Sequence, residues 1–368
     1  MSFTLVDDAD HLSSALDDLP DGPWGVDVER GDSLRYHRRA ALIQVGADGR
    51  AVLIDPLAID DLSALNAAIA GRLCILHALT NDLAPLAKVG VAPEEVADTS
   101  VAAALLGLPT GLAPLMEEIL GVELAPDKER FQRADWEHRP LSDEMLAYAA
   151  GDVTELPALW TALADRLEEA GRMPWYQQEL AATLETAADE SRSWRDVRGT
   201  GRLRPQARAI LRRLWLAREE IAATQDVAPN RILHDKVLVD LAAHPPETPD
   251  GLVKRSDRRR GVLRRNAERL FTALSAGAED DPIEREGPSR RWRDEDRAAQ
   301  DRMRRARSAV ADELGIDPGV LCPGRVLWSA IAAEPADGRE LCAAAGLRPW
   351  QTELLAEPLW EAYVGDDA

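Results

Sequence analysis

One short stretch of the chain carries two carboxylates at a spacing that places them side by side. Polar and apolar residues alternate across residues 24–30 (WGVDVER), which is the pattern of a β-strand. Asp27 and Glu29 therefore project from one face of the predicted strand. Neighbouring carboxylates repel each other unless a cation lies between them, and Mg²⁺ and Mn²⁺ prefer oxygen ligands of this kind. On its own, however, Asp-x-Glu in so acidic a chain is more typical of a solvated edge strand.

Three residues further along could join these two carboxylates. Asp82 opens a predicted helix directly after the buried strand 73–77, where an acid is also favoured by the helix dipole alone. Tyr148 and Asp152 are four residues apart in a helix that Ser142 caps, so they share one helical face. The small residues between them (AAG) leave room for another backbone or a ligand to come close.

The surrounding elements indicate how these residues are positioned. Residues 24–30 lead into a predicted hairpin around the turn 47–50, so the acidic strand opens a three-strand meander. The other predicted elements are a strand at 3–6, a strand at 73–77, helices at 60–71 and 101–108, and helices that begin near Asp10, Asp82 and Ser142. A linker helix is predicted over 174–204.

We divide the chain into three parts. Residues 1–190 mix strands with helices and form a predicted α/β domain. Residues 205–278 and 289–368 are helical in pattern throughout, and the two stretches match in the order and spacing of their helices. The acidic stretch 276–287 between them is typical of a linker.

Composition bounds the class of protein. Among 368 residues, 45% are hydrophobic and 30% charged, which indicates a globular, soluble chain. The net charge of −21 is a poor general match for a nucleic acid, but the arginines cluster late in the chain. The three cysteines lack ligand spacing, and we find neither a signal peptide nor a membrane span. The sequence therefore predicts a cytoplasmic protein with no membrane partner, and we expect a monomer.

Taken together, Asp27, Glu29, Asp82, Tyr148 and Asp152 stand in the order of the DEDD-type 3′-to-5′ exonucleases, and the chain resembles bacterial ribonuclease D in particular. Tyr-x-x-x-Asp at residues 148–152, the segment 127–141 before it and Leu-Ile-Gln at 42–44 resemble that family's motifs. The helical repeats resemble tandem helicase-and-RNase-D C-terminal (HRDC) domains, the first clearly and the second faintly. One departure is Asn81, where the family often carries an acid.

The resemblance implies a fold, a cofactor and a reaction. The fold is a ribonuclease H-like mixed sheet with flanking helices, followed by two all-α HRDC-type domains. Asp27, Glu29 and Asp152 would hold two Mg²⁺ or Mn²⁺ ions, with Asp82 binding one of them through water. Charge supports this, because four clustered carboxylates need about two dications. Tyr148 would orient the attacking water. The substrate would be RNA with a free 3′ end, such as a tRNA precursor, and the products nucleoside 5′-monophosphates.

Candidate RNA contacts are less specific. They comprise a polar residue after the first motif, two cations before the third motif and two arginines of a basic helical stretch: Gln44, Lys128, Arg133, Arg258 and Arg259. The arginines of 255–269 have few compensating acids and could follow an RNA backbone. Those of 290–307 alternate with acids and are typical of a salt-bridged surface. We expect Trp215, Trp292, Trp328, Trp350 and Trp360 to be packing anchors.

Two other functions share some of these features. A DNA exonuclease of the Werner type has the same catalytic motifs, and a nucleic-acid-binding scaffold with a silent nuclease would have lost at least one acid. A sister subclass uses His-x-x-x-x-Asp in place of the tyrosine motif, and residues 138–143 match that string. Pro140 and the cap at Ser142 place His138 and Asp143 on either side of a helix start, so we expect Tyr148 to be used instead.

Overall fold

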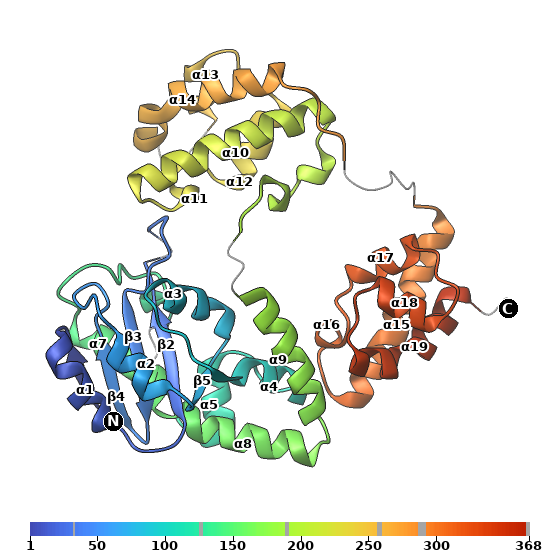
Figure 1. Ribbon diagram of the computed structural model, residues 1–368. Coiled ribbons are helices and arrows are strands. Elements are labelled where there is room, and N and C mark those ends of the chain that lie inside the picture. The colour runs from blue at the N-terminus through green and yellow to red at the C-terminus, as the bar shows by residue number, and fades with distance from the viewer. Residues whose placement is uncertain (32–33, 125–127, 188–190, 256–259, 286–291, 366–368) are drawn as a thin grey trace.

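The computed structural model describes residues 1–31, 34–124, 128–187, 191–255, 260–285 and 292–365. Its first part is a six-stranded mixed sheet with helices on both faces, as the sequence predicts (Figure 1). The strands are β1 (Ser2–Val6), β2 (Trp24–Glu29), β3 (Leu42–Ala47), β4 (Arg50–Ile54), β5 (Leu73–Leu76) and β6 (Glu95–Asp98). The sequence analysis did not identify β6.

The order of the strands is β1-β4-β3-β2-β5-β6, which places the acidic strand β2 inside the sheet. The meander β2-β3-β4 is antiparallel, whereas β1 runs parallel to β4, and β5 and β6 run parallel to β2. The predicted hairpin turn is present: Asp48 and Gly49 both have positive φ, as the two-residue turn of a twisted hairpin requires. The acids of β2 are therefore held on a strand with neighbours on both sides.

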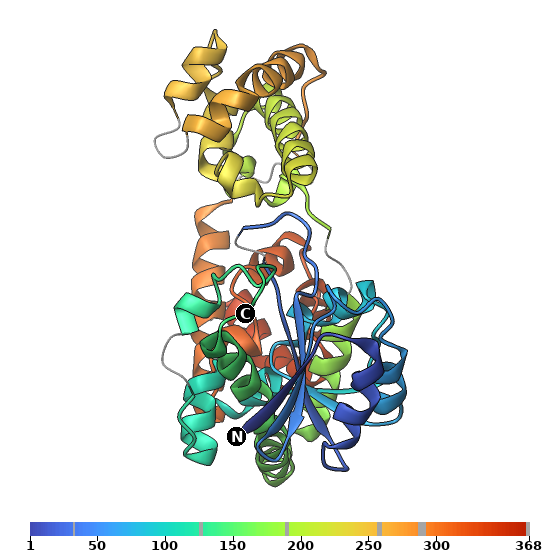
Figure 2. The ribbon, with the colours of Figure 1, turned by 90° about the vertical axis from the view of Figure 1, so that its left-hand side faces the viewer.

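Helices cover the two faces unequally. The helices of this part are α1 (Ala9–Asp17), α2 (Ser63–Ile69), α3 (Leu83–Lys88), α4 (Thr99–Leu106), α5 (Leu112–Leu120), α6 (Lys128–Phe131), α7 (Asp143–Thr154), α8 (Leu156–Glu169) and α9 (Met173–Ala187). Helices α1, α2 and α3 share one buried cluster with one face of the sheet, and α4, α5, α7 and α8 share another with the opposite face (Figure 2). The predicted linker helix 174–204 is shorter, because α9 ends at Ala187.

Helix α7 lies directly on the sheet. A Cβ atom added at Gly25 would lie 2.2 Å from the carbonyl oxygen of Val153, and one added at Gly46 would lie 2.9 Å from a methyl group of Val153. No side chain can occupy either position unless the helix moves away. The two glycines therefore fix the distance between α7 and strands β2 and β3.

The first helical domain is built around one long helix. Its helices are α10 (Pro205–Gln225), α11 (Pro229–Ile232), α12 (Asp235–Ala243), α13 (Pro249–Lys254) and α14 (Arg260–Glu279). They enclose their own apolar cluster, with Leu211, Leu214 and Ile221 of α10 fully buried. The loop between β2 and β3 reaches up to this domain near α11 (Figure 1).

The second helical region packs against the α/β domain. Its helices are α15 (Asp294–Leu314), α16 (Pro318–Leu321), α17 (Val326–Ala332), α18 (Gly338–Ala344) and α19 (Pro349–Val364), and their buried residues belong to the same cluster as those of α4, α5 and α8. Trp350 stacks on Trp175 at a ring-centroid distance of 4.7 Å, and its Nε1 donates to Glu179 at 2.8 Å. The Arg172 guanidinium donates to the carbonyls of Leu105 and Leu314.

Two expectations about this region are confirmed. Trp350 is 1% exposed and acts as a packing anchor. The arginines at the start of α15 form ion pairs with neighbouring acids, Arg293 with Asp296 and Arg297 with Asp294.

Among the described residues, no helix combines the length and apolar character that crossing a membrane requires.

We expect Trp350→Ala to destabilise the α/β domain as well as the helices around it. Removing a buried tryptophan costs about 3–5 kcal/mol, and here the lost contacts lie on α9. Calorimetric unfolding measures the loss. The matched control is Leu216→Ala, at a side chain that is 49% exposed on α10. An equal loss of unfolding free energy in the two variants would show that the contact with α9 contributes nothing to stability.

Candidate active site

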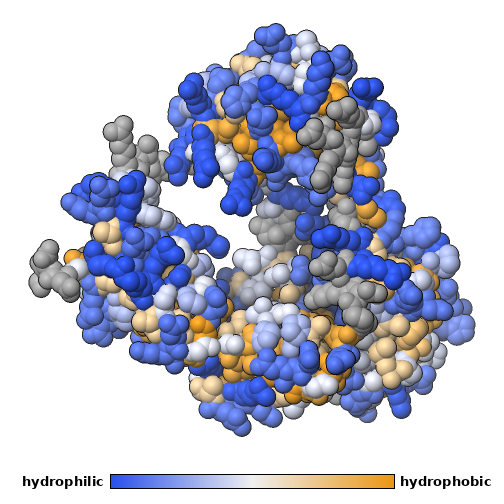
Figure 3. Space-filling model, turned by 180° about the vertical axis from the view of Figure 1, so that it is seen from behind, coloured by the Kyte–Doolittle hydropathy of each residue, from blue (hydrophilic) through white to orange (hydrophobic). Residues whose placement is uncertain are grey.

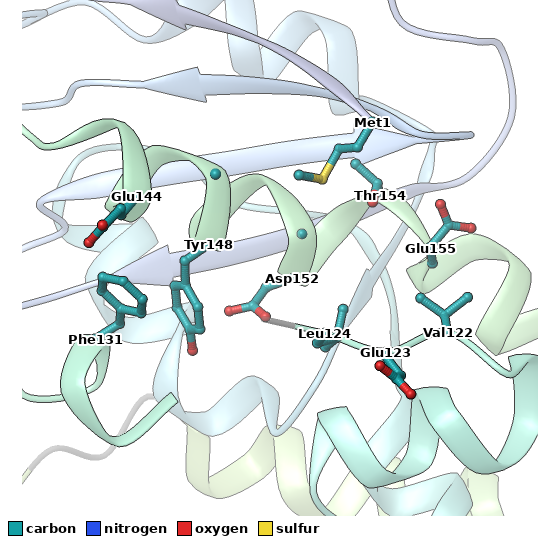
Figure 4. A pocket seen from close by; sticks show the side chains of 12 residues that line it. Met1, Val122, Glu123, Leu124, Phe131, Glu144, Tyr148, Asp152, Thr154 and Glu155 are labelled. Atoms are coloured by element: carbon teal, nitrogen blue, oxygen red, sulfur yellow. The ribbon is translucent and has the colours of Figure 1, made fainter. Parts of the chain in front are cut away.

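Three of the predicted acids meet at the surface of the sheet beneath α7. Asp27 and Glu29 project from the same face of β2, and Asp152 projects towards them from α7. One carboxylate oxygen from each lies within 4.8 Å of the others, which is close enough for a shared cation. All three side chains are half-buried. Figure 4 shows Asp152 beside Tyr148 on one side of the helix.

Asp82 lines the same cavity but stands outside this group of three. It follows a 3₁₀ turn (Leu79–Asn81) and is only 3% exposed. Its carboxylate accepts a hydrogen bond from the backbone N–H of Val28, while Oδ2 is buried with no hydrogen-bond partner. Burial, followed by the charge of Asp27, raises the pKa of Asp82 well above its ordinary value.

A buried acid that the sequence analysis missed fixes the loop before Asp82. Asp98, at the end of β6, is 1% exposed and accepts hydrogen bonds from the backbone N–H groups of Ala78 at 3.0 Å and Leu79 at 2.9 Å. Ala78 has a φ of +61°, an uncommon conformation for a residue with a side chain. Asp98 offsets this cost and orients the turn that presents Asp82. Its only signal in the sequence is its place before a helix.

The cluster carries more negative charge than its protein surroundings balance. Burial is the largest cause that raises the pKa of Glu29 well above its ordinary value, and the charges of Asp27, Asp152 and Asp82 add to it. Arg30 lines the cavity and lowers the pKa of both Glu29 and Asp82, but it does not overcome the other causes. The sequence analysis did not assign Arg30 to the site, although it directly follows the acidic strand. An all-carboxylate donor set with an unpartnered oxygen on Asp82 fits hard divalent cations.

Tyr148 is held in the cavity as a neutral phenol. Its ring stacks on Phe131 at a centroid distance of 4.8 Å and lies 6.3 Å from the ring of Trp136. Its hydroxyl is hydrogen-bonded with Asp152, and burial is the main cause that raises the pKa of the phenol far above its ordinary value. A phenol with so high a pKa donates hydrogen bonds and orients a neighbour, but it does not act as a base at neutral pH.

The other candidate, His138, stands outside α7. It is exposed, and Ser142 caps α7 by accepting from the backbone N–H of Met145 at 3.3 Å. His138 therefore precedes the helix that carries Asp143. Between them, Arg139 donates to both carboxylate oxygens of Asp55 and to the carbonyl of Ala41, which ties the segment before α7 to the sheet.

The predicted RNA contacts differ in their positions. Gln44 lies opposite Asp27 on β3 and is 0% exposed, and neither polar atom of its amide has a hydrogen-bond partner, so its contact with RNA stays a prediction. Arg133 is exposed near Gln132, a residue that lines the cavity. The side chain of Lys128 lies outside the described residues, and so do Arg258 and Arg259.

These side chains surround a cavity of about 560 Å³. Its walls come from β2, from the turn before α3, from the start of α5 and from α7. Tyr148, Asp152 and Leu124 also line a neighbouring cavity of about 550 Å³ along the outer side of α7, with Phe131 beside the tyrosine ring (Figure 4). The acids thus line one of two neighbouring cavities that share Tyr148, Asp152 and Leu124.

In EDTA we expect Glu29→Gln to raise the melting temperature at pH 8 and to change it little at pH 5. The folded pKa of Glu29 is raised, so between about pH 4.3 and that raised value the folded state keeps a proton that the unfolded chain has lost. The stability of the parent protein therefore falls as the pH rises through this window. Glutamine carries no titrating proton, so the variant does not lose stability in this way.

Differential scanning fluorimetry at the two pH values measures the effect. Glu118→Gln, at an exposed acid of α5, is the matched control and should give no pH-dependent gain. Added Mg²⁺ should stabilise the parent more than Glu29→Gln. A lower melting temperature for Glu29→Gln at both pH values would instead make Glu29 a structural residue.

Comparison with known proteins agrees with this geometry. Residues 3–168 match a family described as 3′-5′ exonuclease, and residues 207–274 match the HRDC domain. The chain is 33% identical to a ribonuclease D of Pseudomonas paraeruginosa over 66% of each chain. It is 31% identical to a ribonuclease D of Xanthomonas oryzae over 83% of this chain and 85% of that protein. The crystal structure of Escherichia coli RNase D, titled an exoribonuclease involved in structured RNA processing, superposes with a TM-score of 0.74 at 25% identity and covers 98% of both chains. The chain belongs to the ribonuclease D family of 3′-to-5′ exoribonucleases.

Proposed function

We propose that this chain removes nucleoside 5′-monophosphates one at a time from RNA with a free 3′ end, and that its substrates are precursors of stable RNAs such as tRNA. The observation that carries the proposal is the meeting of Asp27, Glu29 and Asp152 beside a neutral phenol. This arrangement suits hydrolysis of a phosphodiester, because it combines a site for cations with a group that orients water.

The exonuclease family is dependent on divalent metal, and the acidic cluster fits such ions. We propose two ions, Mg²⁺ or Mn²⁺, held by Asp27, Glu29 and Asp152, with the unpartnered Oδ2 of Asp82 directed to one of them through water. When bound, a pair of divalent ions stabilises the attacking and leaving oxygens of an in-line displacement.

The protein side chains would position the reactants. The hydroxyl of Tyr148 donates to Asp152, and its oxygen would accept a hydrogen bond from the attacking water. The Phe131 ring keeps the phenol in place. Arg30 supplies a positive charge at the edge of the acidic cluster, where a phosphate would arrive.

The alternatives make different predictions. A Werner-type enzyme would degrade DNA, and a silent scaffold would degrade neither polymer. The presence of all four acids and of Tyr148 favours an active enzyme. We place the protein in the cytoplasm as a monomer, and its three cysteines are free, buried thiols, as a reducing compartment allows.

We expect the parent protein with Mg²⁺ or Mn²⁺ to release 5′-monophosphates from RNA labelled at its 3′ end. Asp27→Asn should abolish release because it removes a cation ligand while its volume is preserved. The measurement is chromatography of the products from matched RNA and DNA oligomers. RNA blocked with a 3′-phosphate should be resistant. Faster degradation of DNA than of RNA would support a Werner-type DNA exonuclease. Nuclease activity in Asp27→Asn would contradict the assignment of Asp27 to the site.

Tyr148→Phe should lower the turnover number by roughly 10²–10⁴, the range for a lost water-orienting or proton-handling group. The variant retains the ring that stacks on Phe131, so we expect the fold to persist. His138→Ala, at an exposed residue before α7, is the matched control and should stay within a few-fold of the parent. An active Tyr148→Phe with an inactive His138→Ala would transfer the role from Tyr148 to His138.

A further inference from the structure

We propose that the junction between the α/β domain and the first helical domain holds a second RNA site, which binds one nucleotide upstream of the 3′ end. The inference rests on the proposed function, since it assigns a further contact to the same substrate. The site is a separate cavity of about 250 Å³, called here the junction cavity. Four of its lining residues come from the α/β domain, Tyr36, His37, Arg38 and Lys88, and three come from the linker and α10, Arg192, Trp215 and Glu219.

Hydrogen bonds across the junction hold the two walls of the cavity together. Asp226, directly after α10, accepts hydrogen bonds from the backbone N–H groups of Tyr36 at 3.2 Å and His37 at 3.1 Å. It also pairs with Arg39 at 3.1 Å, and the N–H of Ala228 donates to the carbonyl of Leu34 at 2.9 Å. The cavity therefore lies at a defined contact between the domains.

The charge of the junction cavity is opposite to that of the whole chain. Arg38, Lys88 and Arg192 supply three cationic groups, and Glu219 supplies the one carboxylate among its lining residues. In a protein with a net charge of −21, such a concentration of positive charge suits an anionic ligand. The phosphates on either side of one nucleotide would match these groups.

The single carboxylate of the cavity is ion-paired with Arg192, but one of its oxygens accepts no hydrogen bond. Glu219 is 7% exposed, and its Oε1 accepts from Nε of Arg218 at 3.2 Å and Nη2 at 3.0 Å. Its Oε2 forms an ion pair with Nη1 of Arg192 at 3.6 Å but accepts no hydrogen bond. A buried acceptor without a donor is costly, and the N–H groups on the edge of a nucleobase would satisfy it.

An aromatic wall completes the features of a nucleotide site. The Arg192 guanidinium lies 5.4 Å above the ring of Tyr36, so that face of Tyr36 is covered. Trp215 is half-buried and lines the cavity, which leaves it as the residue on which a base would stack. The sequence analysis expected Trp215 to be a packing anchor. The structure adds to that role, because the side chain packs on the domain core and also lines the cavity.

Two short segments of the chain connect the acidic site with the junction cavity. Lys88 is the last residue of α3, and this six-residue helix begins directly after Asp82 and spans about 9 Å. Arg38 lies on the loop that leaves the acidic strand β2. The space-filling view from behind shows a hollow between the first helical domain and the rest of the molecule, with hydrophilic side chains along much of its rim (Figure 3). In this proposal one RNA strand spans the acidic site and the junction cavity.

Binding of the full-length protein to 5′-fluorescein oligouridylates of increasing length, in EDTA, tests the site without cleavage. Lys88→Gln should weaken binding of oligomers long enough to reach the cavity by about fivefold at 0.1 M salt. This follows because each phosphate contact of a single strand contributes a salt slope of about 0.7. Binding of a dinucleotide should not change. Lys236→Gln, at an exposed lysine of α12 outside the cavity, is the charge-matched control.

Oligouridylates that lack the base at one position each test the contact with the base. Loss of the base at one upstream position should weaken binding to the parent protein, and the same loss should not change binding to Trp215→Leu. Melting curves identify any variant that fails to fold. In that case Glu219→Gln is the second test variant, because an amide can donate a hydrogen bond to the base as well as accept one. Equal binding by Lys88→Gln and Lys236→Gln, or equal abasic profiles in parent and Trp215→Leu, would overturn the proposal. If Lys88→Gln binds the longer oligomers less tightly but the parent protein with Mg²⁺ cleaves no RNA, the proposed function is overturned while the junction site still stands.

Discussion

Direct backbone contact between α7 and the sheet is the constraint on which the site depends. Gly25 and Gly46 allow the helix to lie against β2 and β3, since a Cβ atom at Gly25 would meet the carbonyl of Val153 at 2.2 Å. At this separation Asp152 reaches the carboxylates of Asp27 and Glu29. A larger side chain at either glycine would displace α7, and with it both of its site residues, without touching any of the acids.

The same contact concentrates charge where the protein supplies little compensation. Burial and mutual repulsion raise the pKa values of Glu29 and Asp82, and Arg30 opposes this only in part. The surrounding elements must therefore hold the acids in place against their repulsion. Asp98 orders the turn before Asp82 through two backbone hydrogen bonds, and Arg139 anchors the entrance to α7 on Asp55. Neither residue belongs to the group of three acids that share a cation site, yet both help to determine where the acids lie.

Local patterns predicted much of this arrangement. Alternation in β2, the Asp-Gly turn of the hairpin, the cap at Ser142 and the i, i+4 spacing of Tyr148 and Asp152 are short-range signals, and the structure agrees with each of them. Features that depend on distant contacts could not be predicted. The four residues of β6 become a strand only because β5 lies beside them, and Gln44 is buried on a strand against which α7 packs at Gly46. The cavity at the domain junction joins residues almost two hundred positions apart, and no pattern within one segment predicts such a meeting.

The contact between α9 and the last helices has a consequence for synthesis of the protein. Trp175 and Glu179 leave the ribosome well before Trp350, their partner in the folded chain. At about 5–20 residues per second, the interval between them is roughly 9–35 s. Through that time the side of α9 that later meets α19 faces solvent, and the α/β domain is incomplete although its sheet and acids are already made. The nascent enzyme therefore passes through a period in which its catalytic half must avoid other apolar surfaces until its own C-terminal helices arrive.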